Sequence, residues 1–310
     1  MSNRIGVHLI AAATALLALT LPSRTLFGMG PGEMSVLASE ESRGVTELIV
    51  RSDSYDVNLL GTEGATTTVE IFGDRGVEPR IRERGGRLVV EAQERRALFS
   101  RGGGRGRIDI RTGQAVQVEA RTGSGDVDIR RFQDGTVKVD VASGNVEGRA
   151  LYGVLTLRSA SGDIVLERIG GEVEVRSSSG EIELRTGEGE LNVSSTSGTV
   201  SLEQVTGDIS AESTSGGVEV QAGSGTFFLS STSGDVEGDA LEITGGSTFG
   251  SISGNIDLDI DGDPEAFDLN LKSTSGSIRL PGAEIGNQYI RDGGGLSLEA
   301  RTVSGNIRIR

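Results

Sequence analysis

The 310-residue sequence contains no cysteine and no tryptophan, and aromatic residues make up only 4% of it. Without cysteine, the chain cannot form a disulfide, a thiolate metal site, a cysteine nucleophile or a cysteine-linked lipid anchor. The single histidine, His8, lies near the N-terminus in a candidate targeting segment, so the rest of the chain lacks the commonest general base and metal ligand. The shortage of aromatic residues also argues against one thick globular core, because these side chains supply much of the buried area of such a core.

Residues 1–38 have the pattern of an export signal. Arg4 gives a positive start, the run from Ile5 to Leu21 is apolar, and Val36-Leu37-Ala38 is the candidate cleavage motif. The apolar run is slightly short for a membrane-spanning helix, which needs about 20 residues. We therefore expect a cleaved signal peptide, with an uncleaved N-terminal anchor as the alternative and the only membrane contact. In both cases the rest of the chain is exported, to the periplasm, the cell surface or the medium.

Charge is distributed unevenly along the chain. Residues 43–111 contain 13 arginines and 11 acidic residues, a net charge of +2, whereas residues 112–310 contain 15 basic and 31 acidic residues, a net charge of −16. Proteins that bind DNA or RNA depend on Lys and Arg for contacts with phosphate. The acidic body therefore argues against a nucleic acid as partner.

A Ser-Gly pair followed two residues later by Val or Ile recurs through the second part of the chain. The glycines of these pairs are Gly125, Gly144, Gly162, Gly180, Gly198, Gly216, Gly234, Gly254, Gly276 and Gly305. Five consecutive intervals, from Gly144 to Gly234, are 18 residues long. A fixed period of this length is typical of stacked supersecondary units.

Apolar and polar residues alternate on both sides of each glycine. Val173, Val175, Ser177 and Ser179 alternate with more polar residues, and the alternation resumes after Gly180. This pattern predicts strands with one buried face, joined at a corner by the glycine. The predicted fold is therefore all-β, a parallel, β-helix-like solenoid with coils of about 18 residues and two strands in each coil.

Two columns of side chains are expected to line the interior of this solenoid. The Val or Ile residues two positions after the glycines form a β-branched ladder, which suits a pleated, half-buried surface. The serines that directly precede the glycines are also expected to point inward and to form hydrogen bonds along the stack, as polar ladders do in stacked strands.

The region before the regular repeats is a degenerate form of the same unit. Val50–Leu59 aligns position by position with Val175–Leu184 and places Tyr55 in the glycine slot. Because terminal repeats must cover the open edge of the sheet, this region is expected to act as a cap.

The sequence therefore divides into three parts. Residues 1–38 are the signal peptide or anchor, residues 39–112 an irregular β N-terminal cap of degenerate repeats, and residues 113–310 the solenoid repeats. Near the C-terminus, the Gly-rich stretch 281–295 interrupts the period and is predicted to be a capping loop.

One set of aspartates imitates a calcium-binding loop. Asp257, Asp259 and Asp261 are two residues apart, and Asp268 occupies the twelfth position, as in an EF-hand. These four residues are the candidate metal ligands, and calcium is the one cofactor that the sequence suggests. In the alternative interpretation the first three form the outward face of a strand, because apolar residues alternate with them.

A second acidic set lies three residues after the glycines and comprises Asp128, Glu147, Glu183, Glu219, Glu237 and Asp257. Stacked coils would bring neighbours in this column to about 4.8 Å, where like charges repel. Divalent cations or a basic partner would relieve the repulsion. Alternatively, solvent screening leaves each exposed pair worth only about 0–1 kcal/mol, and the surface tolerates it. Thermal melting with and without calcium distinguishes these hypotheses.

No arrangement in the sequence predicts catalysis. Outside the targeting segment there is no histidine or cysteine for a triad, and the acidic pairs that could cleave a sugar repeat along the stack instead of marking one place. Arg101-Gly-Gly-Gly-Arg105-Gly-Arg107 is similar to RNA-binding Gly/Arg segments, but we expect a hairpin loop there. It lacks the Gly-Lys-Ser/Thr of a phosphate-binding loop.

Units such as Ser195-Thr-Ser-Gly-Thr-Val-Ser-Leu202, Ser213-Thr-Ser-Gly-Gly-Val-Glu-Val220 and Ser273-Thr-Ser-Gly-Ser-Ile-Arg-Leu280 resemble those of a bacterial family. It is the putative-adhesin family with β-strand repeats, domain of unknown function 4097, and the resemblance covers roughly residues 45–310. The resemblance implies a location in the cell envelope and a binding role. It supplies no catalytic residues.

The expected function is that of an exported, non-catalytic, adhesin-like protein that binds or scaffolds polysaccharide or protein at the bacterial cell envelope. Three alternatives remain open at this point: a carbohydrate-active β-helix enzyme, an envelope-stress sensing or regulatory protein, and a bactofilin-like polymer. Activity on polysaccharides that is lost on mutating one acidic pair favours the first alternative, and filaments seen in the microscope favour the third.

Overall fold

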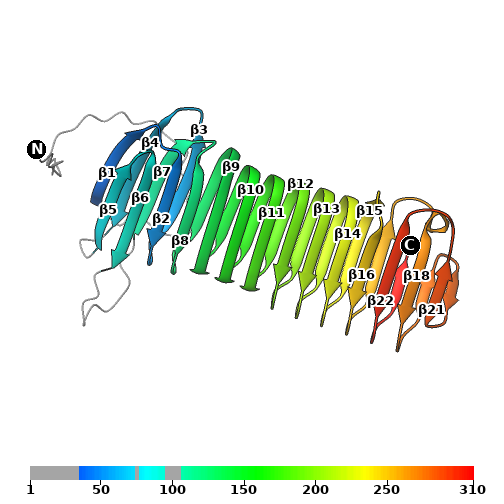
Figure 1. Ribbon diagram of the computed structural model, residues 1–310. Coiled ribbons are helices and arrows are strands. Elements are labelled where there is room, and N and C mark those ends of the chain that lie inside the picture. Colours follow the sequence, from blue (N-terminus) through cyan, green and yellow to red (C-terminus); the bar gives the residue numbers. More distant parts are fainter. Residues whose placement is uncertain (1–34, 74–76, 95–105) are drawn as a thin grey trace, which may run out of the picture. The chain divides into compact units, whose positions relative to one another are not determined.

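The computed structural model describes residues 35–73, 77–94 and 106–310 (Figure 1). Most of the predicted targeting segment and residues 101–105 of the Gly/Arg run lie outside these ranges. The described part of the chain consists of strands and one short 3-10 helix, and no helix in it is long and apolar enough to cross a membrane.

The elements follow one another along the chain as short strands at both ends and long, bent strands between them. The first group comprises β1 Ser35–Arg43, β2 Glu47–Ser52, β3 Asp56–Thr62, β4 Thr66–Gly73, β5 Val77–Arg84, β6 Arg87–Glu94, β7 Gly106–Gly113 and β8 Gln117–Thr122. The central group comprises β9 Val127–Ser143, β10 Val146–Ser161, β11 Ile164–Ser179, β12 Ile182–Ser195, β13 Val200–Ser213 and β14 Val218–Ser231. The last group comprises β15 Val236–Ile243, β16 Ser247–Ser251, β17 Ile256–Ile260, η1 Pro264–Ala266, β18 Asp268–Ser273, β19 Ile278–Leu280, β20 Ala283–Ile285, β21 Gln288–Arg291, β22 Ser297–Thr302 and β23 Ile307–Ile309.

The central strands stack in parallel with a register of one repeat. Val146 of β10 lies beside Ile164 of β11, which lies beside Ile182 of β12, and the same shift of 18 residues continues through β13 and β14. Each coil thus hydrogen-bonds to the next with its side chains in columns. The predicted parallel β-solenoid is confirmed.

Each coil folds back at a second corner that lies six residues after the glycine. There a non-glycine residue adopts a positive φ between 52° and 61°, at Arg131, Ala150, Arg168, Thr186, Gln204, Ala222 and Ala240. Such conformations cost about 1–3 kcal/mol and persist where the surroundings fix them, in this case the coils stacked on either side. Because the bend needs only one residue, β10 to β14 each run through it without a break.

The predicted β-branched ladder forms the centre of the core. Its members, Val127, Val146, Ile164, Ile182, Val200, Val218, Val236, Ile256, Ile278 and Ile307, are at most 1% exposed. Together with the apolar residues of the second half of each coil they form one continuous hydrophobic cluster along the stack.

The prediction that the serines directly before the glycines point inward is wrong. These residues, Ser124, Ser143, Ser161, Ser179, Ser197, Ser215, Ser233, Ser253, Ser275 and Ser304, are all exposed. The buried hydroxyls lie two residues earlier and comprise Thr122, Ser159, Ser177, Ser195, Ser213, Ser231, Ser251, Ser273 and Thr302. From Ser159 onward the two residues after this buried position are both exposed, so the inward and outward alternation ends there instead of continuing to the glycine.

The corner glycines are required by the stacking itself. A Cβ on Gly216 would overlap the carbonyl oxygen of Gly198 in the adjacent coil, and the same overlap recurs at each of the other corner glycines. Tyr55 occupies the corresponding slot below Gly125, as predicted, and its buried ring covers Gly73 and Gly106.

The first coil of the chain is not the outermost at the N-terminal end. β2 and β3 lie between the coil of β6 and β7 on one side and that of β8 and β9 on the other, in parallel on both sides. β5 then covers β6, β4 covers β7, and β1 covers β4, all antiparallel. The predicted irregular β cap is therefore confirmed, and it ends the parallel stack by reversing strand direction.

The C-terminal end is built in the same way. β22 and β23 lie between β16 and β17 on one side and β18 and β19 on the other, again in parallel (Figure 1). β21 and β20 cover β18 and β19 in antiparallel pairing, so the stretch predicted as a capping loop consists largely of two edge strands. The coils in space therefore follow the order of their glycines as Gly234, Gly254, Gly305, Gly276.

Two of the predicted domain boundaries fall at strands. Residue 38 lies inside β1, whose residues Ser35 to Arg43 pair with β4, and residue 112 lies at the end of β7. Cleavage after Ala38 would therefore divide β1.

Candidate binding groove at the Ser-Gly corners

The four candidate calcium ligands do not form one site. Asp257 and Asp259 lie on β17, and Asp257 forms ion pairs with Arg308 at 3.3 Å and Arg310 at 2.9 Å. Asp268 instead accepts backbone hydrogen bonds from the glycines at 293–295, which lower the pKa of its carboxyl group. No group of three or more carboxylates among the described residues is placed to hold a metal ion.

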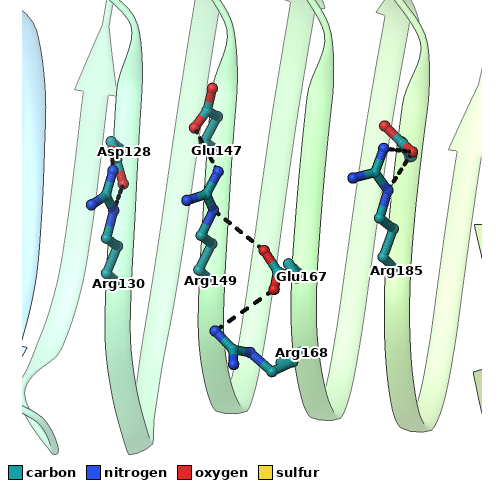
Figure 2. Close-up of polar contacts among 8 residues, drawn as sticks. Asp128, Arg130, Glu147, Arg149, Glu167, Arg168 and Arg185 are labelled. Atoms are coloured by element: carbon teal, nitrogen blue, oxygen red, sulfur yellow. Dashed lines mark hydrogen bonds and ion pairs between the residues drawn. The ribbon is translucent and has the colours of Figure 1, made fainter. Parts of the chain in front are cut away.

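Most members of the predicted acidic column have their own cationic partner. Asp128, Glu147 and Glu183 each pair with an arginine two residues along the same strand, and Arg149 also reaches Glu167 in the next coil (Figure 2). Val165 and Ser201 interrupt the column between these residues. Most of the repulsion expected from the sequence is therefore relieved within the protein.

Asp128 and Glu147 are neighbours in consecutive coils, and each has an arginine partner. Glu219, Glu237 and Asp257 are neighbours in three consecutive coils. Partial burial, followed by the charges of Glu219, Asp235 and Asp257, raises the pKa of Glu237. A raised pKa in an acid means that the folded state favours the protonated form. The contribution of Glu237 to stability is thus largest at acid pH and is lost as the pH rises through its pKa in the folded protein.

We expect Glu237→Gln to raise the midpoint of thermal unfolding at pH 7 and to have no effect near pH 4. Because the side chain is largely exposed, the gain should be below about 1 kcal/mol. Glu183→Gln is the matched control, since it removes a carboxylate that is paired with Arg185 at 2.5 Å and should give no gain. An equal rise in both variants would contradict the assignment.

The Ser-Gly corners are of two types. At the tight corners of Gly144, Gly162 and Gly180 the strands continue to the serine before the glycine, whereas at looped corners, from Gly198 onward, they end at the buried hydroxyl. Figure 1 shows the resulting narrow loops at the lower ends of the strands from β12. The residue two positions before the glycine differs accordingly. It is Ala142, Ala160 or Ser178 at the tight corners, and Thr196, Thr214, Thr232, Ile252, Thr274 or Val303 at the looped corners.

The buried hydroxyl connects successive looped corners. Ser213 Oγ accepts a hydrogen bond from the Gly216 N–H at 2.9 Å and donates one to the Gly198 carbonyl of the preceding coil, also at 2.9 Å. Ser231 repeats the donation, to the Gly216 carbonyl at 2.8 Å. The polar ladder predicted from the sequence therefore exists, but it is formed by these buried hydroxyls and not by the serines directly before the glycines.

Ser177 lies at the last tight corner and does not take part in this ladder. At the tight corners of Gly144 and Gly162 the glycine N–H donates to a serine carbonyl of the next coil, as Gly162 does to Ser179 at 3.1 Å. The Ser177 hydroxyl is buried and has no hydrogen-bond partner among the described residues. An unsatisfied buried hydroxyl costs about 1–3 kcal/mol, so Ser177 lowers the free energy of unfolding of the protein.

We expect opposite effects from the same substitution at these two serines. Ser213→Val should lower the free energy of unfolding by about 1–3 kcal/mol, because the Gly216 N–H and the Gly198 carbonyl lose their partner. Ser177→Val should be neutral or stabilising, since no bond is lost and Val141 already occupies the equivalent position two coils earlier. Urea unfolding measures both, and a loss at Ser177 equal to that at Ser213 would contradict this account.

A groove of about 520 Å³ lies where the corner type changes. The pairing of β10 with β11 continues to Ser161 and Ser179, but that of β11 with β12 ends at Ser177 and Ser195. The groove crosses five coils beside this step. Its outward-facing lining consists of Arg158, Arg176, Ser178, Ser194, Thr196, Glu212, Thr214, Ser230 and Thr232, and Ser177 lies beneath them. It is thus a local departure from the repeat.

The sequence also matches a known family along most of its length. The family model described as Toastrack DUF4097 matches residues 45–227 and 189–310. The chain belongs to the Toastrack family. This confirms the resemblance that the Ser-Gly units indicated. No curated protein matches the sequence.

Several solved structures are similar to this Toastrack protein at low sequence identity. A "putative adhesin" from Parabacteroides distasonis is 11% identical, with 90% of this chain and 98% of that chain covered and a TM-score of 0.40. A "putative cell adhesion protein" from Clostridium sporogenes is 12% identical, with 88% and 98% covered and a TM-score of 0.22. A "putative lipid binding protein" from P. distasonis is 13% identical, with 88% and 96% covered and a TM-score of 0.33.

Sequence reasoning did not find the groove in this Toastrack chain. The ten Ser-Gly pairs look alike, and attention to the glycine alone hides the change of corner. The available signal was the residue two positions before the glycine, which is small at three consecutive corners and β-branched from Thr196 onward.

Proposed function

We propose that this protein is an exported, non-catalytic, adhesin-like binding protein of the bacterial cell envelope, and that it binds an extended polysaccharide in the groove at the Ser-Gly corners. The observation that carries the proposal is the groove itself. It is shallow and elongated, and the side chains that face it are almost all hydroxyl-bearing or charged. Such groups hydrogen-bond sugar hydroxyls, and five coils at about 4.8 Å provide a length suited to several sugar units.

The family membership and the targeting pattern at the N-terminus support export to the envelope. The absence of histidine and cysteine from residues 9–310 supports binding without catalysis, because the common nucleophile and base pairs cannot form. Protein is the other class of envelope partner, and the open, polar groove favours polysaccharide over it. A protein partner would more often bury apolar anchors.

The test is a pull-down of purified envelope polysaccharide and envelope protein fractions with the protein and two variants. Thr214→Trp places a large side chain in the groove, and Thr206→Trp makes the same change at an exposed position in the same coil outside it. We expect the polysaccharide fraction to bind to the unmodified protein and to Thr206→Trp but not to Thr214→Trp. Binding of the protein fraction alone, or binding unaffected by Thr214→Trp, would refute the proposal.

A further inference from the structure

Two arginines at one end of the groove share a single carboxylate. Arg158 and Arg176 are partners in the register of β10 and β11, and both contact the same oxygen of Glu174, at 3.3 Å and 2.8 Å. Each guanidinium carries five N–H donors in a planar fork, so one shared oxygen leaves most of them available. On the opposite face of the solenoid, by contrast, Arg130 and Arg185 each have a carboxylate that they do not share with another arginine (Figure 2).

The floor of the groove beside this pair contains the unpartnered hydroxyl. Ser177, which directly follows Arg176, is only 5% exposed, and its Oγ has no hydrogen-bond partner among the described residues. A buried polar atom in a native protein is nearly always satisfied, and exceptions concentrate where a ligand or a water completes the set. The two guanidiniums and this hydroxyl therefore all line the same end of the groove.

The other end of the groove has a different character. Glu212 lies two coils from Arg176, and one coil further β14 contributes Ser230 to the lining. Phe228 precedes Ser230 by two residues on the same outward face of β14, next to the lining, and is 46% exposed. The neighbours of Phe228 in its column are Ser210 and Thr248, so the aromatic ring is a departure from a polar row. An exposed ring of this kind offers an apolar face on which a sugar can stack.

We propose that the groove selects a polysaccharide that carries carboxylate groups, of the uronic acid type. This inference rests on the proposed function and names the ligand class of the same groove. A sugar carboxylate bridges Arg158 and Arg176, neutral sugar hydroxyls meet Ser194 and Glu212, and a sugar ring covers Phe228. Guanidinium forks recognise carboxylates through paired, charge-assisted hydrogen bonds, which fixes the orientation of the chain.

The net charge of −16 on residues 112–310 acts against an anionic ligand, but it is not concentrated in the groove. The unpaired carboxylates Glu219 and Glu237 lie on the outward face of the first half of the coil, whereas the groove follows the second half. At physiological ionic strength, charges separated by more than about 8 Å through solvent are largely screened. The local arrangement at Arg158 and Arg176 therefore determines the charge of the ligand that the groove binds.

Calorimetry with polygalacturonate oligomers and with the same oligomers fully methyl-esterified tests this inference, because esterification removes the charge of each carboxylate and adds only a methyl group. We expect the acidic oligomers to bind and the esters to bind at least about tenfold more weakly, with affinity falling as salt is added. Arg158→Ala combined with Arg176→Ala should remove the difference between the probes. Arg185→Ala, which removes an arginine from the opposite face, should leave it intact.

Two further variants separate recognition from folding. Ser177→Ala should lower affinity for the acidic oligomers while the unfolding midpoint stays the same or rises, and Phe228→Ser should weaken both probes equally. Equal binding of the two probes, or no binding of polygalacturonate, overturns the inference about charge. In either case, envelope polysaccharide that still binds and is blocked by Thr214→Trp would leave the proposed function intact.

Discussion

Gly216→Ala is expected to destabilise the solenoid by about 3 kcal/mol or more, although it adds a single methyl group. That methyl group would overlap the carbonyl group of Gly198, and Thr199 N would lie only 2.9 Å from it. These atoms belong to the backbone of the next coil, and the hydrogen-bonded spacing of about 4.8 Å leaves them no room to move. Relief would require breaking the ladder between β13 and β14 at the corner.

The neighbouring residue provides the control. A Cβ on Gly217 would have its nearest contact, the Asp235 carbonyl oxygen, at 3.5 Å, which is an ordinary distance. Gly217→Ala should therefore change stability by less than about 0.5 kcal/mol. Guanidinium unfolding of both variants measures the difference, and similar midpoints would show that stacking does not require the glycine.

Deletion of residues 297–310 is expected to disorder the whole C-terminal end. The deleted segment contains β22 and β23, which hydrogen-bond on both sides and bury Leu298, Ala300, Ile307 and Ile309. Its loss leaves β16 and β17 paired on one side only, with β14 and β15, and separates β18 and β19 from the stack by the space of one coil. Hydrogen exchange should show loss of protection throughout β18–β21.

Deletion of residues 199–216 from the middle of the solenoid should be far better tolerated, although it removes 18 residues instead of 14. It joins Gly198 to Gly217 and brings β12 against β14 in the register that β13 now has with each of them. In a one-dimensional stack such a change removes one repeat and one interface without disturbing the others. If the two deletions cost the same stability, the inserted C-terminal coil has no special role.

The fold could be predicted from the sequence because every repeat carries the same buried and corner positions. The Val and Ile residues that follow the glycines define a buried column, and Tyr55 could be placed in the glycine slot by simple alignment. The serine column was misplaced because alternation alone does not say at which residue a strand ends. The difference between Ser177 and Ser179 depends on where the chain turns, and that is decided by contacts with the next coil.

The sequence could not predict the spatial order of the last coils or the position of the groove, for a related reason. Gly254, Gly276 and Gly305 occur in nearly the same local sequence, so nothing in each unit states which neighbour it will stack against. The EF-hand-like spacing is a similar case. Asp257 and Asp268 have the spacing of one loop, but a strand and a turn place them apart, and arginines from the inserted coil pair with Asp257.

The insertion of both terminal coils determines how the molecule would respond to tension. A force applied beyond Arg310 acts on β23, which is clamped by β17 on one side and β19 on the other. An outermost coil can be peeled away one hydrogen bond at a time, but a clamped coil must slide against two ladders that rupture together. β2 and β3 are clamped in the same way at the opposite end. Tension at the N-terminal end can peel the outermost strand β1 from β4, but it then meets the clamped β2. The solenoid therefore resists unravelling beyond its outermost strand at that end and from β23 at the other.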